Sequence, residues 1–369
     1  MSLKANLQEF PGLSHQAFQH PLDRQAMIAL EKVPLLPQGV SFVSSAFFER
    51  LLHIEHISDN TRVTAQQYPS LYRQYLKLAA VLDVKRLPDL YIDTTPTVNA
   101  YATGIQNYFI VLNSGLIDIL TEDELLAILG HELGHVKCEH MLYTTLAQFL
   151  RDYGVDILNQ FVPVGLGALA GQGLQLALME WYRKAEFSCD RAALIATQNV
   201  ESICSALAKL AGYAKNLDGA LNLEEIMRQA NDYQEIGAES KVEKVLKLYV
   251  LLNKTHPYPV VRVKEIRQWS ESTEYAQILA GNYKQLVAQA TRPSGMQPLA
   301  TPTGVKCTNP KCGRVWSPGT GFCGKCSTNL RNAPTVCGNC FVVVKASWAN
   351  CVACGNALNG NLMPSQIKS

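Results

Sequence analysis

Residues 131–135 read His-Glu-Leu-Gly-His, a spacing that restricts the fold around it. On an α-helix, positions i and i+4 lie one above the other, so His131 and His135 can direct ring nitrogens at one metal ion. Glu132 would then lie beside the metal without binding it. From there it can take a proton from a metal-bound water, whose pKa falls from about 16 toward about 7. The motif therefore requires a helix and predicts peptide bond hydrolysis.

The sequence around the motif independently predicts a buried helix. Apolar residues recur at helical spacing, and Thr121 with Glu124 three residues later has the pattern of a capping box. Gly130 and Gly134 weaken a helix by up to about 1 kcal/mol each relative to alanine. We therefore expect another backbone to pack closely against these two positions. The alternative is a core helix that carries two incidental histidines.

A third metal ligand must come from another segment of the chain. Glu139 lies about 12 Å along the helix axis from His131, too far for both side chains to reach one ion. Glu186 and Asp190 are better candidates, because they are again i and i+4 on a predicted helix. One carboxylate can bind the metal while the other orients a ligating histidine. The alternative is an ordinary acidic helix face between two arginines.

These residues resemble the membrane-linked gluzincins typified by HtpX and the CAAX prenyl proteases. The resemblance runs from about residue 60 to 270 and is carried by four matching segments. They are Val98–Gly104 with Tyr108–Asn113, His131–His135, Arg183-x-x-Glu186-Phe187-x-x-Asp190, and Thr255-His256-Pro257 followed by Arg262. Cys189 stands where the family usually has alanine, a similarly small residue.

The resemblance implies roles for individual residues. His131, His135 and Glu186 would bind zinc, with Glu132 as general base and acid. Asp190 and Arg262 would support the ligands from behind, and His256 would help to stabilise the oxyanion. A histidine held before Pro257 suits that task, because a tetrahedral intermediate needs a donor aimed at its negative oxygen. Taken without the resemblance, His256 is better interpreted as a capping or core residue.

Three short segments before the motif predict strands. They are rich in apolar and aromatic residues and are bounded by Pro, Thr, Asn and Gly. The segments are Leu90–Ile92, Val98–Thr103 and Tyr108–Asn113. An extended substrate could add to an exposed edge of such a sheet. Asn99 and Ala100 are then the predicted substrate contacts. The alternative is a small sheet that binds no ligand.

An uncharged stretch from Ile157 to Met179 is long enough to cross about 30 Å of hydrocarbon. Its glutamines, asparagine, proline and four glycines keep its hydrophobicity modest, however. We expect a buried or hinged helical hairpin over the active site rather than a membrane span. The start of the sequence has no signal peptide pattern. We therefore expect a cytoplasmic protein, with peripheral membrane contact left open.

The end of the chain predicts a separate zinc-binding module. Eight of the eleven cysteines follow a linker-like run rich in Pro, Ser and Gly, and they form four pairs that are ten residues apart. Paired thiolates on turns suit tetrahedral zinc, whereas disulfides would suit an exported chain. The simplest assignment is a double zinc ribbon with Cys307, Cys312, Cys323 and Cys326 at one zinc and Cys337, Cys340, Cys351 and Cys354 at the other.

The charge of this module argues against nucleic acid as its main partner. Residues 293–369 contain seven Lys or Arg and no Asp or Glu, which gives this part a net charge of +7. The preceding residues carry 26 basic and 31 acidic side chains, a net charge of −5. Two zinc ions with four thiolates each would bring the module to about +3. The basic residues are scattered and form no stripe. A protein partner, for recruitment or regulation, is therefore the better expectation.

Together these observations predict an α+β chain: a mostly helical zincin-type metallopeptidase domain with a small antiparallel sheet, plus the ribbon module. The expected parts are a helical extension (1–60), the metallopeptidase domain (61–291), a linker (292–305), the double ribbon (306–358) and a tail (359–369). The expected function is zinc-dependent endopeptidase activity on peptide or protein substrates, with one catalytic and two structural zincs. The alternative is a non-catalytic scaffold that binds protein or nucleic acid through the ribbons.

Overall fold

A computed structural model describes residues 7–33, 36, 40, 43–44, 46–105, 107–153, 168–213, 221–236, 246, 258–285, 303–306, 315–316 and 335–337. The chain divides into two compact units, Met1–Val287 and Ala288–Ser369, and each is described by itself. The predicted domain boundaries at residues 60 and 291 stay predictions.

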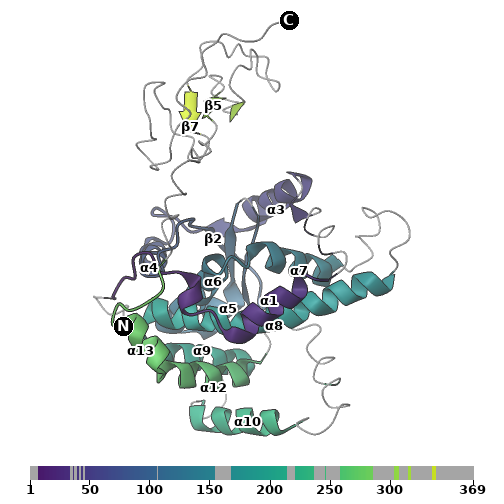
Figure 1. The fold of residues 1–369 in the computed structure, drawn as a ribbon. Coiled ribbons are helices and arrows are strands. Elements are labelled where there is room, and N and C mark those ends of the chain that lie inside the picture. The colour runs from purple at the N-terminus through teal and green to yellow at the C-terminus, as the bar shows by residue number, and fades with distance from the viewer. Residues whose placement is uncertain are drawn as a thin grey trace, which may run out of the picture. The chain divides into compact units, whose positions relative to one another are not determined.

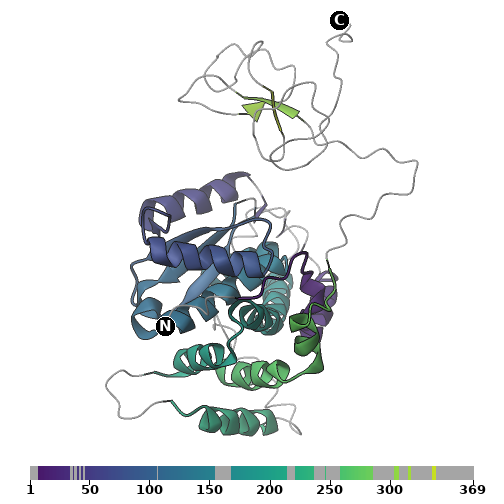
Figure 2. The same ribbon diagram turned by 90° about the vertical axis from the view of Figure 1, so that its left-hand side faces the viewer.

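The first unit is mostly helical (Figures 1 and 2). A short 3₁₀ helix, His15–Ala17, precedes the α-helices. These are α1 (Pro21–Leu30), α3 (Ala46–Asp59), α4 (Pro69–Val81), α5 (Ser114–Ile119), α6 (Glu122–Lys137), α7 (Met141–Tyr153), α8 (Ala168–Thr197), α9 (Val200–Ala211), α10 (Leu223–Glu235), α12 (Pro259–Ser270) and α13 (Thr273–Leu279).

A four-stranded sheet lies beside these helices, in the order β1-β2-β4-β3. Its strands are β1 (Thr61–Arg62), β2 (Asp89–Asp93), β3 (Ala100–Thr103) and β4 (Phe109–Asn113). The three predicted strand segments correspond to β2, β3 and β4. The predicted antiparallel sheet is wrong in one respect, because β2 and β4 are parallel, with Leu90 opposite Ile110. In the sequence, β3 comes between β2 and β4. In the sheet, β3 pairs antiparallel with β4, on the side of β4 that faces away from β2. The sheet is therefore mixed.

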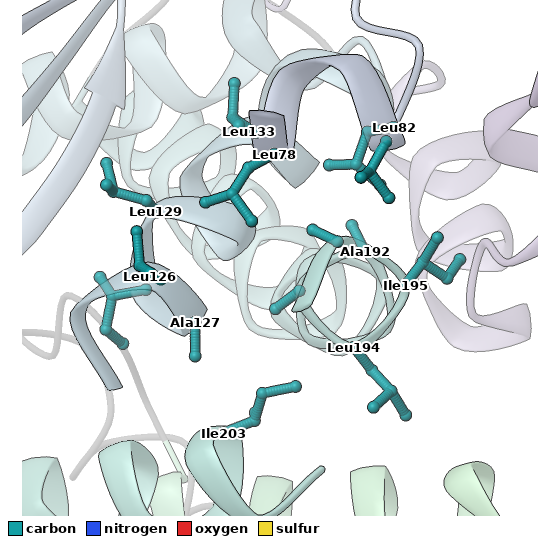
Figure 3. Close-up of a cluster of buried hydrophobic side chains, with 14 of the residues drawn as sticks. Leu78, Leu82, Leu126, Ala127, Leu129, Leu133, Ala192, Leu194, Ile195 and Ile203 are labelled. Atoms are coloured by element: carbon teal, nitrogen blue, oxygen red, sulfur yellow. The ribbon is translucent and has the colours of Figure 1, made fainter. Parts of the chain in front are cut away.

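Helices α6 and α8 form the centre of the first unit. Figure 3 shows apolar side chains of α6 and α8 gathered with those of α4 and α9 in one buried cluster, with Leu78 of α4 beside Leu129 and Leu133 of α6. Helix α8 also packs against α1 and α7, while α9, α12 and α10 form successive layers beyond it (Figure 1). The core thus joins the helix that carries the His-Glu-Leu-Gly-His motif to the helix that carries Glu186.

The two glycines of α6 lie where α8 comes closest. A Cβ atom at Gly134 would lie 2.8 Å from Cβ of Ala192 and 2.9 Å from Cα of Cys189. At Gly130 it would lie 3.1 Å from Cα of Ala193. The prediction of a closely packed backbone at both positions is therefore confirmed, and the partner is α8.

The uncharged stretch 157–179 is described only from residue 168 onward, where it forms the first part of α8. Residues 157–167 lie outside the described part of the chain, so the predicted hairpin stays a prediction. Among the described helices, none combines the length and the apolar character that a bilayer crossing needs.

The second unit contains a small antiparallel sheet in the order β6-β5-β7. Its strands are β5 (Thr303–Lys306), β6 (Val315–Trp316) and β7 (Thr335–Cys337). Cys307 and Cys312 fall between β5 and β6 in the sequence, and Cys337 is the last residue of β7. Apart from Cys337, the predicted zinc cysteines, Cys307 and Cys312 included, lie outside the described residues. The double zinc ribbon therefore stays a prediction.

The close approach of α6 and α8 predicts the effect of adding one methyl group. Gly134→Ala should lower the free energy of unfolding by about 1–3 kcal/mol, because the new Cβ would force the two helices apart. Gly173→Ala on α8 is the matched control. A Cβ at residue 173 meets no atom within 4 Å, so this change should stabilise the helix by about 0.5–1 kcal/mol. Urea denaturation measures both, and equal effects of the two substitutions would contradict the packing argument.

Candidate metal centre

The helix that carries the histidine pair begins at the predicted capping box. Thr121 accepts a hydrogen bond from the backbone of Glu124, whose carboxylate accepts one from the backbone of Thr121. The same carboxylate contacts Lys209 and Ser205 of α9. The capping box is therefore confirmed, and α9 fixes the start of α6 in place.

His131, His135 and Glu186 come together in the buried space between α6 and α8. Nε2 of His131 lies 3.5 Å from Oε2 of Glu186, and Nε2 of His135 lies 3.3 Å from Oε1 of the same carboxylate. Ligand atoms about 2.0–2.1 Å from a tetrahedral zinc are separated by about 3.4 Å. The spacing of these three side chains fits a zinc ion. Their nitrogen and oxygen donors are also those that zinc prefers in hydrolytic sites.

Asp190 and Arg262 lie directly behind the three candidate ligands. Oδ1 of Asp190 lies 2.9 Å from Nδ1 of His131, which leaves Nε2 of that ring directed at Glu186. Arg262 donates to both oxygens of Asp190 at 2.8 and 2.6 Å, and to Glu186 at 2.8 Å. One guanidinium thus holds two carboxylates that come from successive turns of α8.

Burial and the nearby charges shift the pKa values of the two imidazoles in opposite directions. Burial lowers the pKa of His131, but the charge of Glu186 and the hydrogen bond to Asp190 outweigh it and raise this pKa to about 9. Burial lowers the pKa of His135 to about 4, although Glu186 opposes the change. Burial also acts to raise the pKa of Asp190, but Arg262 holds it below its usual range. The carboxylates therefore favour a proton on His131 more strongly than on His135.

Besides the Glu186 carboxylate, the Cys189 sulfur is a second possible donor near the histidines. Ligand atoms of His131, His135 and Cys189 lie within 4.8 Å of one another. Burial raises the pKa of the Cys189 thiol well above its usual value, and its Sγ lies 3.7 Å from Nδ1 of His140. Zinc binds the thiolate and not the thiol. The carboxylate of Glu186, which faces both Nε2 atoms, is therefore the better third ligand.

Of the two predicted catalytic residues, the structure describes Glu132 but not His256. Glu132 follows His131 on α6 and is almost fully buried. It is therefore on the same helix as the two predicted ligands, as its predicted role requires. His256 lies outside the described residues, so its predicted contact with the oxyanion stays a prediction.

The predicted substrate contacts lie at the end of the sheet. Ala100 begins β3, the last strand in the sheet order, and the carbonyl of Asn99 accepts a hydrogen bond from Asn113. Farther along β3, Gln148 of α7 donates to the carbonyl of Ala102. A substrate strand therefore has less of β3 to pair with than the sequence suggested. A cavity of about 200 Å³ adjoins this strand, with α3 and α7 forming its other walls.

Several residues that lie around His135 were not predicted from the sequence. Nδ1 of His140 lies 3.4 Å from Nδ1 of His135, and the ring of Tyr182 stacks on the His135 ring with their centres 5.9 Å apart. His140 in turn contacts Asp23 of α1. The chain order gave no signal for Asp23, which is 117 residues away from His140. His140 follows His135 by five residues, a spacing that places two residues on different faces of a helix, so it gave no signal of the contact.

Comparison with known proteins identifies the family of the chain. The profile of peptidase family M48 matches residues 65–270, more than half of the chain. The chain belongs to peptidase family M48. This M48 peptidase is 32% identical over 290 residues to the plastoglobule-localized metallopeptidase 48, chloroplastic, of Arabidopsis thaliana, and the alignment covers 78% of this chain and 80% of that protein. The predicted resemblance to HtpX-like metallopeptidases is thereby confirmed at the level of the family.

Two HtpX relatives match a shorter part of the M48 peptidase. The protease HtpX homolog of Moorella thermoacetica is 33% identical over 173 residues, which is 41% of this chain and 57% of that protein. The protease HtpX homolog 2 of Methanosarcina mazei is 33% identical over 177 residues, 42% of this chain and 60% of that protein. The chain thus spans little more than half the length of these two relatives. Membership in M48 makes it a metalloprotease, and zinc-dependent proteolysis is the activity that the family implies.

The double contact of Arg262 predicts a large cost for its removal. Arg262→Met should lower the free energy of unfolding of the zinc-free protein by about 3–5 kcal/mol, because it leaves two buried carboxylates without their cation. Arg267→Met on the same helix is the control. Arg267 pairs with Glu201 at the surface, so its loss should cost less than about 1 kcal/mol. Urea denaturation in the presence of a chelator distinguishes the two, and similar losses would contradict the assignment of Arg262.

Proposed function

We propose that the M48 peptidase is an endopeptidase whose catalytic zinc is held by His131, His135 and Glu186. The observation that carries the proposal is the spacing of the two Nε2 atoms from the Glu186 carboxylate, 3.5 and 3.3 Å, which suits a tetrahedral ion. Three protein ligands leave the fourth position for water, as hydrolytic zinc sites require. Bound zinc supplies an activated water at neutral pH and polarises the scissile carbonyl.

Each remaining residue of the site has a separate task. Glu132 takes the proton from the attacking water and passes it to the leaving amine. Asp190 holds the His131 ring through Nδ1, so that Nε2 faces the ligand position. Arg262 fixes Glu186 and Asp190 together. His256 donates to the oxyanion as the tetrahedral intermediate forms.

The substrate is proposed to bind in extended form beside Asn99 and Ala100 at the start of β3. Support comes from the place of β3 at the end of the sheet and from the adjoining cavity of about 200 Å³. Because α7 bonds to β3 at Ala102, only a short stretch of substrate backbone can pair there. The cavity, lined by Leu52, Tyr101 and Phe149 among others, then receives one substrate side chain.

Substitution of the general base, Glu132, tests the endopeptidase proposal. Glu132→Gln should lower kcat on a quenched peptide or casein by about 10²- to 10⁴-fold, because the amide cannot accept the water proton. The zinc content should not change, since Glu132 is not a ligand. Glu122→Gln is the control, because Glu122 is exposed in the first turn of the same helix. Equal activity of parent and Glu132→Gln, or no activity in either with zinc bound, would contradict the proposal.

We further propose two structural zinc ions in the second unit. One is held by Cys307, Cys312, Cys323 and Cys326, and the other by Cys337, Cys340, Cys351 and Cys354. These ribbons are proposed to bind a protein partner, and the chain is proposed to act in the cytoplasm or at a membrane surface. Support for the ribbons comes from the four regularly spaced cysteine pairs and from the short antiparallel strands, of which β5 ends just before Cys307, β6 follows Cys312 and β7 ends at Cys337.

Metal analysis tests these zinc assignments. The full chain should contain about three zinc ions, and the His131→Ala/His135→Ala variant about two, because the cysteine sites do not depend on the histidines. Inductively coupled plasma mass spectrometry gives both counts. A histidine variant that holds no zinc would show that the cysteine assignment is wrong.

A further inference from the structure

Asp23 of α1 is a fully buried carboxylate with an unusual number of donors around it. Its Oδ1 accepts from the Trp181 indole at 3.1 Å, and its Oδ2 accepts from Ser188 at 2.7 Å and from Gln19 at 3.1 Å. Nε2 of His140 lies 3.1 Å from the same Oδ2. Burial acts to raise the pKa of Asp23, but His140, followed by Ser188 and Gln19, outweighs it and lowers the pKa to about 2. The side chain is therefore an anion at neutral pH.

The end of helix α6 places His140 against the second zinc ligand. The backbone N–H of His140 bonds to the carbonyl of His135 at 2.9 Å, and that of Glu139 bonds to the carbonyl of Val136 at 3.2 Å. Glu139 has a positive φ of 60°. These are the bonds of a Schellman motif, which turns the chain back on the last helical turn. As a result, Nδ1 of His140 lies 3.4 Å from Nδ1 of His135.

The charge of Asp23 decides which nitrogens carry protons along this row. A carboxylate only accepts, so Nε2 of His140 must carry the proton that it donates to Asp23. In a neutral imidazole the other nitrogen is then an acceptor. With His140 neutral, its Nδ1 therefore accepts a hydrogen bond from the Nδ1–H of His135, and Nε2 of His135 keeps its lone pair for a metal. The S–H of Cys189 lies at 3.7 Å from the same Nδ1 of His140 and adds a weak second donor.

We infer that His140 and Asp23 are positioning residues for the catalytic zinc, acting through His135. They hold the His135 ring and its tautomer, as Asp190 does for His131. The inference rests on the zinc site of the proposed function. It also makes α1, which precedes the family match at residues 65–270, part of the metal centre.

Partners behind a ligating histidine typically change metal affinity by about 10- to 100-fold when they are lost. Asp23→Asn keeps the size of the side chain but removes its charge. It should speed the loss of catalytic zinc to a chromophoric chelator by about 10- to 100-fold. His140→Leu should have an effect of the same order. Because Asp23 acts through His140, the double variant should lose zinc no faster than His140→Leu alone.

Two further variants separate positioning from simple support of the fold. Leu30→Ala removes a buried side chain from the same helix as Asp23. It should lower stability by about 2–5 kcal/mol while zinc is released at the parental rate. The His131→Ala/His135→Ala variant measures the zinc held elsewhere on the full chain and is subtracted as the blank.

The outcomes separate this inference from the proposed function. Faster zinc release in Asp23→Asn and His140→Leu, non-additive in the double variant and absent in Leu30→Ala, supports the positioning role. Parental release in Asp23→Asn, or equal acceleration in Leu30→Ala, overturns it. If the parent protein holds no more zinc than the blank, the proposed zinc site has failed and the inference falls with it.

Discussion

The contact between helices α6 and α8 is the constraint on which the rest of the structure depends. Two glycines of α6 let the backbone of α8 approach until a methyl group would no longer fit. At this distance the side chains of His131 and His135 from one helix meet Glu186 from the other. A wider separation would leave the histidines beside each other with no carboxylate in reach. Packing and metal chemistry therefore share one interface.

The same closeness concentrates charge in a buried place, and the fold offsets it with fixed partners. Glu186 and Asp190 lie one helical turn apart, and the guanidinium of Arg262 on α12 contacts both. On the far side of the site, Asp23 on α1 meets His140, Ser188 and Trp181. Helices from both ends of the first unit thus supply the groups that orient α6 and α8 residues. Leaving any of these charges unpaired would cost several kcal/mol.

Local sequence was enough to predict what depends on local structure. The helix 122–137, its capping box and its close contact at Gly130 and Gly134 followed from residues a few positions apart. The meeting of Glu186 with the histidines could be proposed because both pairs show the i, i+4 spacing of a helix. The parallel pairing of β2 with β4, and the row from His135 to Asp23, depend on contacts between distant segments. No periodicity in the sequence reports such contacts, so both were missed.

The most direct measurement is a zinc-edge anomalous difference map from crystals of the full chain. We expect a peak bounded by Nε2 of His131, Nε2 of His135 and a carboxylate oxygen of Glu186, each at about 2.0–2.2 Å from the ion. A peak bonded to Cys189 in place of Glu186, or no peak between α6 and α8 in zinc-loaded crystals, would contradict it.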